Sequence, residues 1–265
     1  MTILVAVERI KQKDIKTMNN IQPLKKLTPD ATIHQIISAE KSVETLLLSI
    51  GLSPENHKSE TLRSVCQQKK WSEVEVLKWL KKNCQDNSIQ SSNKGELPDF
   101  GNDLSQWCYY VQDNFLIKNH ELLEEISNDF TRVHKIHGNQ YEWLKNMHWH
   151  LKYLEDKLNY YFNFQQYKLF PLLNRLKDSK NKALHGTIKK ISNGIEIIEE
   201  DQSEILKLIN AIEKKGKGLE SPDGACSTLR ILNNNIKTLF SSLRKQVEIE
   251  RKNVIPLIKR KLEMV

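Results

Sequence analysis

The chain has 265 residues with 9 glycines, 7 prolines and a formal net charge of +8. This length suits one or two domains, and so few helix-breaking residues favour long helices with few tight turns. The Lys and Arg residues are interspersed with acidic residues, which is typical of solvated helix faces. No basic block carries the interleaved aromatic residues that a nucleic-acid surface needs, so we do not expect a nucleic-acid partner.

The beginning of the chain does not resemble a signal peptide. Residues 1–10 include a short apolar run, but no basic segment precedes it and no small-residue cleavage site follows it. No stretch approaches the roughly 20 apolar residues that span a bilayer. We therefore expect a cytoplasmic protein without a membrane partner. The four cysteines form no CxxC pair, and we expect thiols or small core residues rather than disulfides.

Two segments have the composition of connecting regions. Residues 1–28 lack a clear period and are expected to form an N-terminal arm. Residues 85–100 are polar, rich in Ser and Asn and closed by Pro98, which predicts a linker. This division leaves residues 29–84 as a small domain and residues 101–265 as a larger one.

The small domain is expected to contain three helices. Thr32 is a typical N-cap for a helix over about residues 32–50, and Gly51 has the place of a C′ glycine. A short second helix follows. The pattern Ser72-Glu-Val-Glu75 is a capping box that opens the third helix.

The larger domain shows helical periodicity in four long segments. The segments are joined by short loops, which favours an antiparallel four-helix bundle and makes the whole chain all-α. They cover about residues 103–136, 140–173, 187–215 and 225–262.

Two prolines lie inside the apolar patterns of the second and fourth segments. Pro171 follows Leu169-Phe170, and Pro256 follows Val254-Ile255 at an equivalent place. A proline inside a helix costs about 3 kcal/mol unless a kink or an end is wanted there. Each could end its helix, but the two equivalent positions indicate a fixed bundle geometry.

A helical bundle builds a metal site from inward-facing His and carboxylate side chains one turn apart. No E-x-x-H pair occurs on the long segments, and His120 with Glu124 is their only H-x-x-x-E pair. His148 and His150 are two residues apart and face different sides of a helix, so they do not form a chelating pair, and their role stays open. The histidines of this region are His120, His134, His137, His148, His150 and His185.

The stretch Gly51–Cys66 matches the frame of a motif with a Gly at its start, a Cys pair and a final Cys, although Glu55-Asn56 stands where the Cys pair belongs. With this stretch and the predicted bundle, the chain resembles the iron–sulfur cluster repair family. These stress-responsive di-iron proteins have a small N-terminal helical domain followed by a hemerythrin-like bundle. The resemblance runs from about residue 30 to the end of the chain.

Within the bundle, the resemblance implies four candidate metal ligands. His120 matches a family histidine on the first helix, and His137 matches one in the family's V-H-G stretch. The third helix contributes Glu199 or Glu200, depending on a one-residue register, and Glu250 matches a bridging glutamate of the last helix. The turn Pro222–Thr228 also matches a turn motif of the family.

Other family ligands are replaced. Tyr161 and Gln246 stand in place of histidines, and Gln165-Gln166 stand in place of glutamates. Neutral amides are weak ligands for iron, whereas a tyrosine can bind ferric iron.

Two hypotheses follow from these replacements. In the first, the protein binds iron, as one ion or as a remodelled pair, through His120, His137, Glu250 and a glutamate of the third helix. In the second, it is a metal-free helical binding or regulatory module that meets a protein partner or associates with itself. No catalytic residues are identified, and whether the protein is an enzyme stays open.

Overall fold

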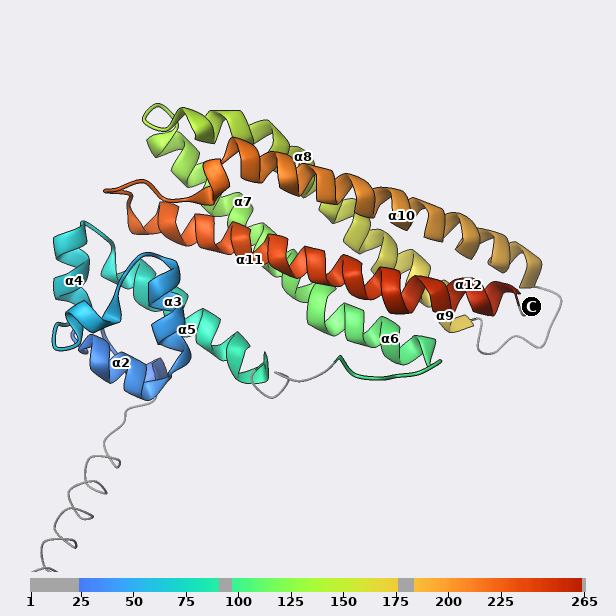
Figure 1. Cartoon of the computed structure of the whole chain (residues 1–265), viewed down its shortest axis with the longest axis horizontal. Helices are drawn as coiled ribbons and strands as arrows, with labels where there is room; N and C mark the ends of the chain where they lie inside the picture. Colours follow the sequence, from blue (N-terminus) through green and yellow to red (C-terminus); the bar gives the residue numbers. More distant parts are fainter. Residues whose placement is uncertain (1–23, 91–96, 176–183, 264–265) are drawn as a thin grey trace, which may run out of the picture. The chain divides into compact units, whose positions relative to one another are not determined.

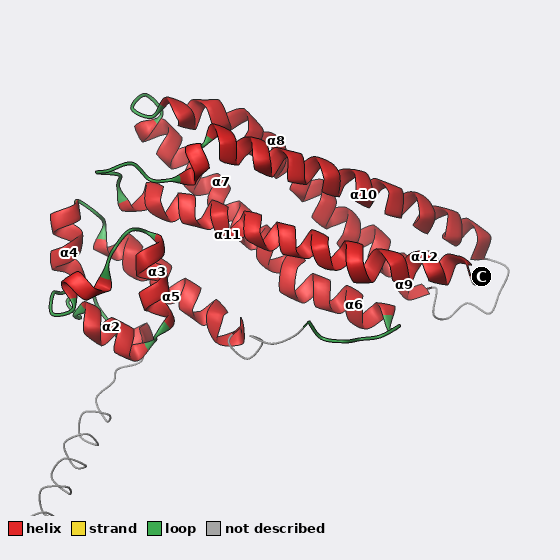
Figure 2. Cartoon of the chain, viewed as in Figure 1, coloured by secondary structure: helices red, strands yellow, loops and turns green. Residues whose placement is uncertain are grey.

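The computed structural model describes residues 24–90, 97–175 and 184–263. Helices make up nearly all of the described chain (Figure 2), and its only β feature is an isolated bridge between Thr32 and Thr61. The all-α prediction is therefore confirmed. None of the helices in these residues is long and apolar enough to cross a membrane.

Contacts divide the chain into two compact units. The first contains the chain up to Glu96 together with Pro222–Ile231, and the second contains Leu97–Ser221 and Leu232–Val265. The four cysteines Cys66, Cys84, Cys108 and Cys226 form no disulfide with one another.

The first unit consists of short helices around an apolar core. Its elements are η1 (Leu24–Lys26), α2 (Ile33–Ala39), α3 (Ser42–Ser49), η2 (Pro54–His57), α4 (Leu62–Lys69) and α5 (Glu73–Gln90). Thr32 caps α2 through a capping box with Gln35, as an N-cap was predicted there. Gly51 follows α3 with a φ of +82°. This is the left-handed conformation that the predicted C′ position requires.

The predicted helix over residues 32–50 is interrupted. Glu40 is extended, with a φ of −156°, and separates α2 from α3. Its carboxylate accepts hydrogen bonds from the Ser42 backbone N at 3.2 Å and from Ser42 Oγ at 3.0 Å. Periodicity missed this break because the local hydrogen bonds of Glu40 compete with the helix, although the apolar spacing continues through it.

The ends of this unit also differ from the predicted segments. Leu27 is buried in the core of the unit, so the last residues of the expected arm belong to the fold, whereas residues 1–23 lie outside the described chain. Helix α5 continues through Gln90 into the expected linker because no glycine or proline occurs before Gly95.

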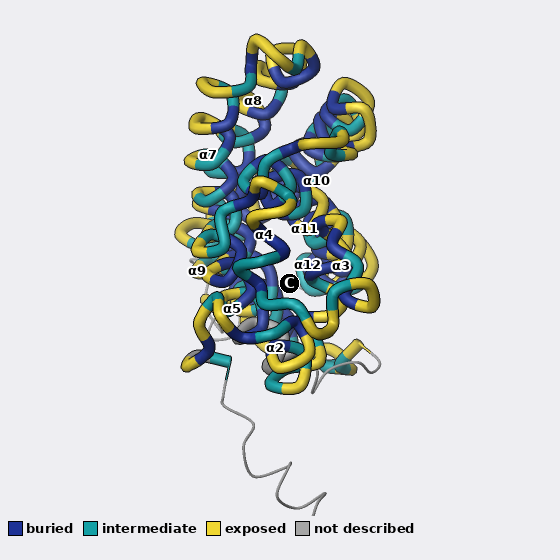
Figure 3. The backbone as a smooth tube through the Cα atoms, turned by 90° about the vertical axis from the view of Figure 1, so that its left-hand side faces the viewer, coloured by how far each residue is buried: buried dark blue, intermediate teal, exposed yellow. Residues whose placement is uncertain are grey.

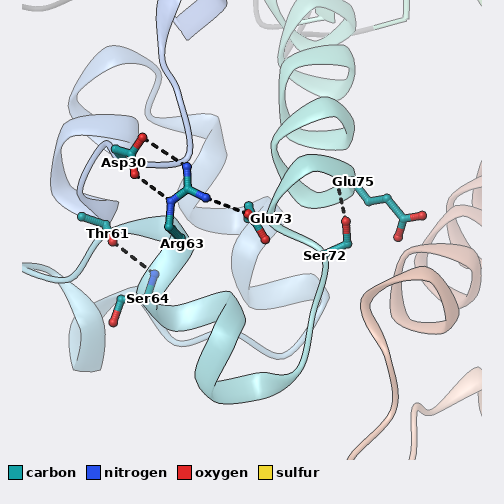
Figure 4. A network of polar contacts seen from close by, with 7 residues as sticks. All are labelled: Asp30, Thr61, Arg63, Ser64, Ser72, Glu73 and Glu75. Carbon is teal, nitrogen blue, oxygen red and sulfur yellow. Dashed lines mark hydrogen bonds and ion pairs between the residues drawn. The ribbon is translucent and has the colours of Figure 1, made fainter.

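Arg63 joins three parts of the first unit. Its guanidinium donates to both carboxylate oxygens of Asp30, at 2.7 and 3.2 Å, and to Glu73 Oε1 at 3.0 Å (Figure 4). These contacts tie the segment before α2 and the start of α5 to α4. The Arg63 side chain is 42% exposed, so solvent screens these ion pairs and each contributes little to stability.

The segment Pro222–Ile231 packs into the first unit although it follows the third long helix. Trp71 donates its indole N–H to the carbonyl of Ala225 at 3.1 Å, and the Arg230 guanidinium lies over the Trp71 ring at 5.3 Å. Arg230 also donates to the carbonyl of Ile50, and Thr228 Oγ1 donates to Glu75 Oε2 at 2.7 Å. We call these contacts the Trp71 clasp.

The second unit contains the four long predicted helices, which run alternately in opposite directions (Figure 1). Helix α8 packs against α7 and α10, and α10 packs against α12. Buried residues line the inward sides of these helices (Figure 3). The elements are α6 (Leu104–Val111), η4 (Gln112–Leu116) and α7 (Ile117–His137), then α8 (Glu142–Phe164), η5 (Gln165–Leu169) and α9 (Phe170–Arg175), then α10 (Leu184–Lys215) and η6 (Lys217–Leu219), and finally α11 (Ser227–Ile249), η7 (Glu250–Val254) and α12 (Ile255–Glu263).

Neither proline of the bundle ends its helix. Pro171 lies in α9 and Pro256 in α12, and each is six residues beyond the start of a five-residue π-helical segment, η5 or η7. A π turn inserts an extra residue and loosens the preceding turn. This makes space for the proline ring and tolerates the loss of the hydrogen bond that its missing N–H would have donated. The equivalent prolines therefore mark equivalent π segments.

The Trp71 clasp predicts different costs for alanine at two glycines. A Cβ at Gly51 would lie 2.8 Å from Arg230 Nη1, whereas a Cβ at Gly224, with a similar φ of +75°, would have no heavy atom of the described chain within 4 Å. We expect Gly224→Ala to lower the free energy of unfolding by about 1 kcal/mol through backbone strain alone. Gly51→Ala should lower it by about 2 kcal/mol because Arg230 must also move. Urea unfolding of the whole chain measures both values, and equal losses would contradict the clasp.

Candidate functional site

Six polar side chains meet inside the second unit, and each is at most 3% exposed. All four long helices contribute to this group, which we call the Glu250 cluster. It comprises Asn119 on α7, Tyr161 on α8, Gln165 at the start of η5, Gln202 on α10, Gln246 on α11 and Glu250 at the start of η7.

The carboxylate of Glu250 is the centre of the cluster and accepts three hydrogen bonds. Tyr161 donates its hydroxyl to Oε2 at 2.5 Å, and Gln202 Nε2 donates to the same oxygen at 2.7 Å. Gln246 Nε2 donates to Oε1 at 2.8 Å, from one turn earlier on the same long helix. A carboxylate has about four acceptor sites, so three of them are occupied by protein donors.

Outer groups orient two of these donors. Arg251 donates its Nε–H to Gln202 Oε1 at 2.8 Å, so the amide nitrogen of Gln202 faces Glu250. Asn119 Nδ2 donates to Gln246 Oε1 at 3.0 Å and orients Gln246 in the same way. Each amide therefore uses its oxygen on an outer donor and its nitrogen on the carboxylate.

Burial changes the ionisation of the central pair. It raises the pKa of the Glu250 carboxyl, and the hydrogen bonds from Tyr161, Gln246 and Gln202 oppose that change by favouring the carboxylate. Burial, followed by the charge of Glu250, raises the pKa of Tyr161 well above its ordinary value. Tyr161 therefore keeps its proton and acts as a hydrogen-bond donor.

Of the four candidate ligands, the structure places only Glu250 in this cluster. His120 is next to Asn119 on α7 but is half-buried, and its ring lies edge-on to Phe162 with the two ring centroids 6.1 Å apart. His137 lies at the C-terminal end of α7, 18 residues beyond Asn119, which corresponds to about 27 Å along a helix. There it contacts Gln140 and Tyr141.

The candidate glutamates of the third long helix also lie elsewhere. Glu199 pairs with Lys259 at 2.8 Å near the surface. Glu200 is exposed; it is two residues before Gln202 and therefore faces roughly the opposite side of α10. The structure does not bring the four candidates together.

Sequence reasoning missed two members of the cluster, Asn119 and Gln202. Both carry a signal that could have identified them: a single polar residue within regular apolar spacing. Gln202 stands between Ile198 and Ile205, and Asn119 between Phe115 and Leu123, all of which are buried. A polar residue at such a position must find partners inside the bundle.

The donor set of the cluster does not fit a pair of iron ions. It contains one carboxylate, one protonated phenol and four neutral amides, whereas a di-iron site needs several imidazoles and bridging carboxylates. Nowhere in the described ranges do three or more His, Cys, Asp or Glu side chains come together as metal ligands would. The cluster is instead built to solvate one buried carboxylate.

A stack of histidine rings lies at the end of α7 and α8 opposite the Glu250 cluster. The rings of His134 and His148 stack with their centroids 4.8 Å apart, and Phe130 stacks against both. Burial, then the charges of His148 and Lys145, lowers the pKa of His134. His150 lies edge-on to Trp149, and its buried Nδ1 has no partner in the described part of the chain.

The buried hydrogen bond of Tyr161 should contribute more to stability than a similar one at the surface. Tyr161→Phe keeps the ring but removes one donor from the carboxylate of Glu250, so we expect the free energy of unfolding to fall by about 2–3 kcal/mol. Tyr153→Phe is the matched control, because its hydroxyl donates to Glu204 at 2.5 Å in an exposed position. That variant should lose clearly less stability than Tyr161→Phe, because solvent screens the exposed hydrogen bond. Similar losses in urea unfolding would contradict the central role of Glu250.

The histidine stack predicts a pH effect with a definite sign. Because the folded-state pKa of His134 is lowered, its neutral form is favoured by folding. Its contribution to stability is complete above the ordinary histidine pKa, near 6.5, and is lost as the pH falls below that value. NMR titration should show His134 titrating below 6.5, and His148→Gln should move its pKa upward. An unchanged value would contradict the interaction.

Comparison with known proteins finds distant relatives. Over 150 residues, or 55% of the chain, the sequence is 22% identical to the iron–sulfur cluster repair protein YtfE of Cronobacter sakazakii. Identity to the YtfE proteins of Salmonella typhimurium and Escherichia coli is 20% and 21%. The match spans 63–64% of these curated relatives, less than two thirds of their length. No protein-family model matches the chain. The chain is thus distantly similar to iron–sulfur cluster repair proteins.

Proposed function

We propose that this protein is a metal-free relative of the iron–sulfur cluster repair proteins, with a hemerythrin-like bundle that acts as a binding or regulatory module. In this proposal the Glu250 cluster takes the structural place of a di-iron centre. The bundle then contacts a protein partner, or a second copy of the chain, without supplying iron.

The observation that carries the proposal is that the carboxylate of Glu250 accepts hydrogen bonds from Tyr161, Gln202 and Gln246. A metal ion would need the lone pairs that these donors occupy. Binding it would also require Tyr161 to lose a proton that burial and the neighbouring carboxylate retain. The amides of Gln202 and Gln246 would have to turn away from Glu250 and break their bonds to Arg251 and Asn119.

The distant similarity to YtfE supports the choice of family. Tyr161, Gln165 and Gln246, which the family motifs align with iron ligands, belong to one buried cluster with Glu250. This agreement supports a common bundle in which the ligand positions kept their inward direction and changed their chemistry.

Metal analysis tests the proposal. We expect the protein made in iron-supplemented medium to contain far less than one iron or zinc per chain by elemental analysis. Its thermal midpoint should not change with a chelator, because no bound metal stabilises the fold. Stoichiometric iron, with the visible absorption of a tyrosinate–iron(III) bond, would overturn the proposal in favour of an iron site at Tyr161 and Glu250.

A designed gain of function provides the control. The triple variant Tyr161→His, Gln165→Glu, Gln246→His replaces three cluster groups with imidazole and carboxylate ligands around Glu250. We expect it to bind iron under the same conditions and to lose thermal stability with a chelator. Equal iron contents in this variant and the natural sequence would contradict the assignment of these positions.

A further inference from the structure

One polar group of the Glu250 cluster has no hydrogen-bond partner. Gln165 is 1% exposed, and its Nε2 makes no hydrogen bond of normal geometry within the described chain. The amide is nevertheless close enough to Tyr161 and Glu250 to favour their ionised forms. Leaving such a donor unpaired in a core is destabilising, so we expect it to have a partner.

A small cavity has Gln165 in its wall. Gln165 and Glu250 line it together with apolar residues, and the space open to the centre of a water molecule is about 10 Å³. This is about the smallest volume that holds one water, and too small for a larger ligand. The apolar lining residues are Leu169, Phe170, Ile195, Ile198, Val254, Ile255 and Ile258.

The backbone explains why the cavity lies at this level. Gln165 and Glu250 are the first residues of η5 and η7, and both π segments carry further lining residues, Leu169 and Val254. A π turn widens the helix by one residue and displaces the side chains that follow. Two such turns beside the same space leave a gap that the apolar side chains do not fill.

We propose that one water molecule binds in this cavity, accepting a hydrogen bond from Gln165 Nε2 and donating one to the carboxylate of Glu250. The water satisfies the only cluster amide nitrogen without a partner among the described groups. It also supplies a fourth donor to a carboxylate that already accepts three. This inference rests on the metal-free state proposed above.

A crystal structure of the whole protein at a resolution that shows ordered waters is the direct test. We expect one density peak about 2.7–3.2 Å from both Gln165 Nε2 and a Glu250 carboxylate oxygen. A dry cavity, or Gln165 bonded directly to Glu250, would overturn the inference. Metal analysis of the same sample separates the two proposals, because a metal-free but dry protein contradicts only the water site, whereas a bound metal contradicts the proposed function.

Filling the cavity provides a second test that needs no crystal. Val254→Ile adds one methylene-sized group to the cavity wall. If a water is bound there, its displacement leaves Gln165 unpaired, and we expect the thermal midpoint to fall by about 2–4 °C. If the cavity is dry, the added group improves packing and the midpoint rises, which would contradict the proposal.

The variant Gln165→Met is the matched background for this experiment. It keeps the length of the side chain and removes the amide. In this background Val254→Ile no longer strands a buried donor, so the fall in the midpoint should disappear. A fall of the same size in both backgrounds would indicate steric strain alone and would overturn the inference.

Discussion

The interior of the bundle depends on the solvation of one buried carboxylate. Glu250 is 3% exposed, and an ionised group at such depth is strongly destabilising unless donors replace water. Tyr161, Gln202 and Gln246 provide those donors from three long helices. The helices must therefore keep one relative register, because a shift of one residue would remove a donor from the carboxylate.

Backbone and side chains at this level are linked. Glu250 and Gln165 each begin a π-helical segment, and each segment is followed by a proline, Pro256 or Pro171. The π turns offset the steric cost of the prolines, and they place Gln165 and Glu250 beside the same small cavity. The polar cluster is thus part of the helix geometry as well as of the side-chain packing.

The first unit shows how contacts can differ from chain order. The Trp71 clasp brings Pro222–Ile231 into this unit, although its residues follow the third long helix of the bundle. Ile231 even belongs to the apolar core formed by α2 to α5. A boundary drawn from composition alone cannot show such a contact, because the linker signal at residues 85–100 records only local polarity.

The sequence by itself determined the all-α class, the approximate limits of the four long helices, the cap at Thr32 and the turn at Gly51, since periodicity and capping are local. The family motifs also led to Tyr161, Gln165, Gln246 and Glu250, and these four side chains lie in one buried cluster. Only the tertiary structure decided that Asn119 rather than His120, and Gln202 rather than Glu200, face the core. Neighbouring positions on a helix differ by about 100° in direction, so the packing of the other helices selects which residue points inward.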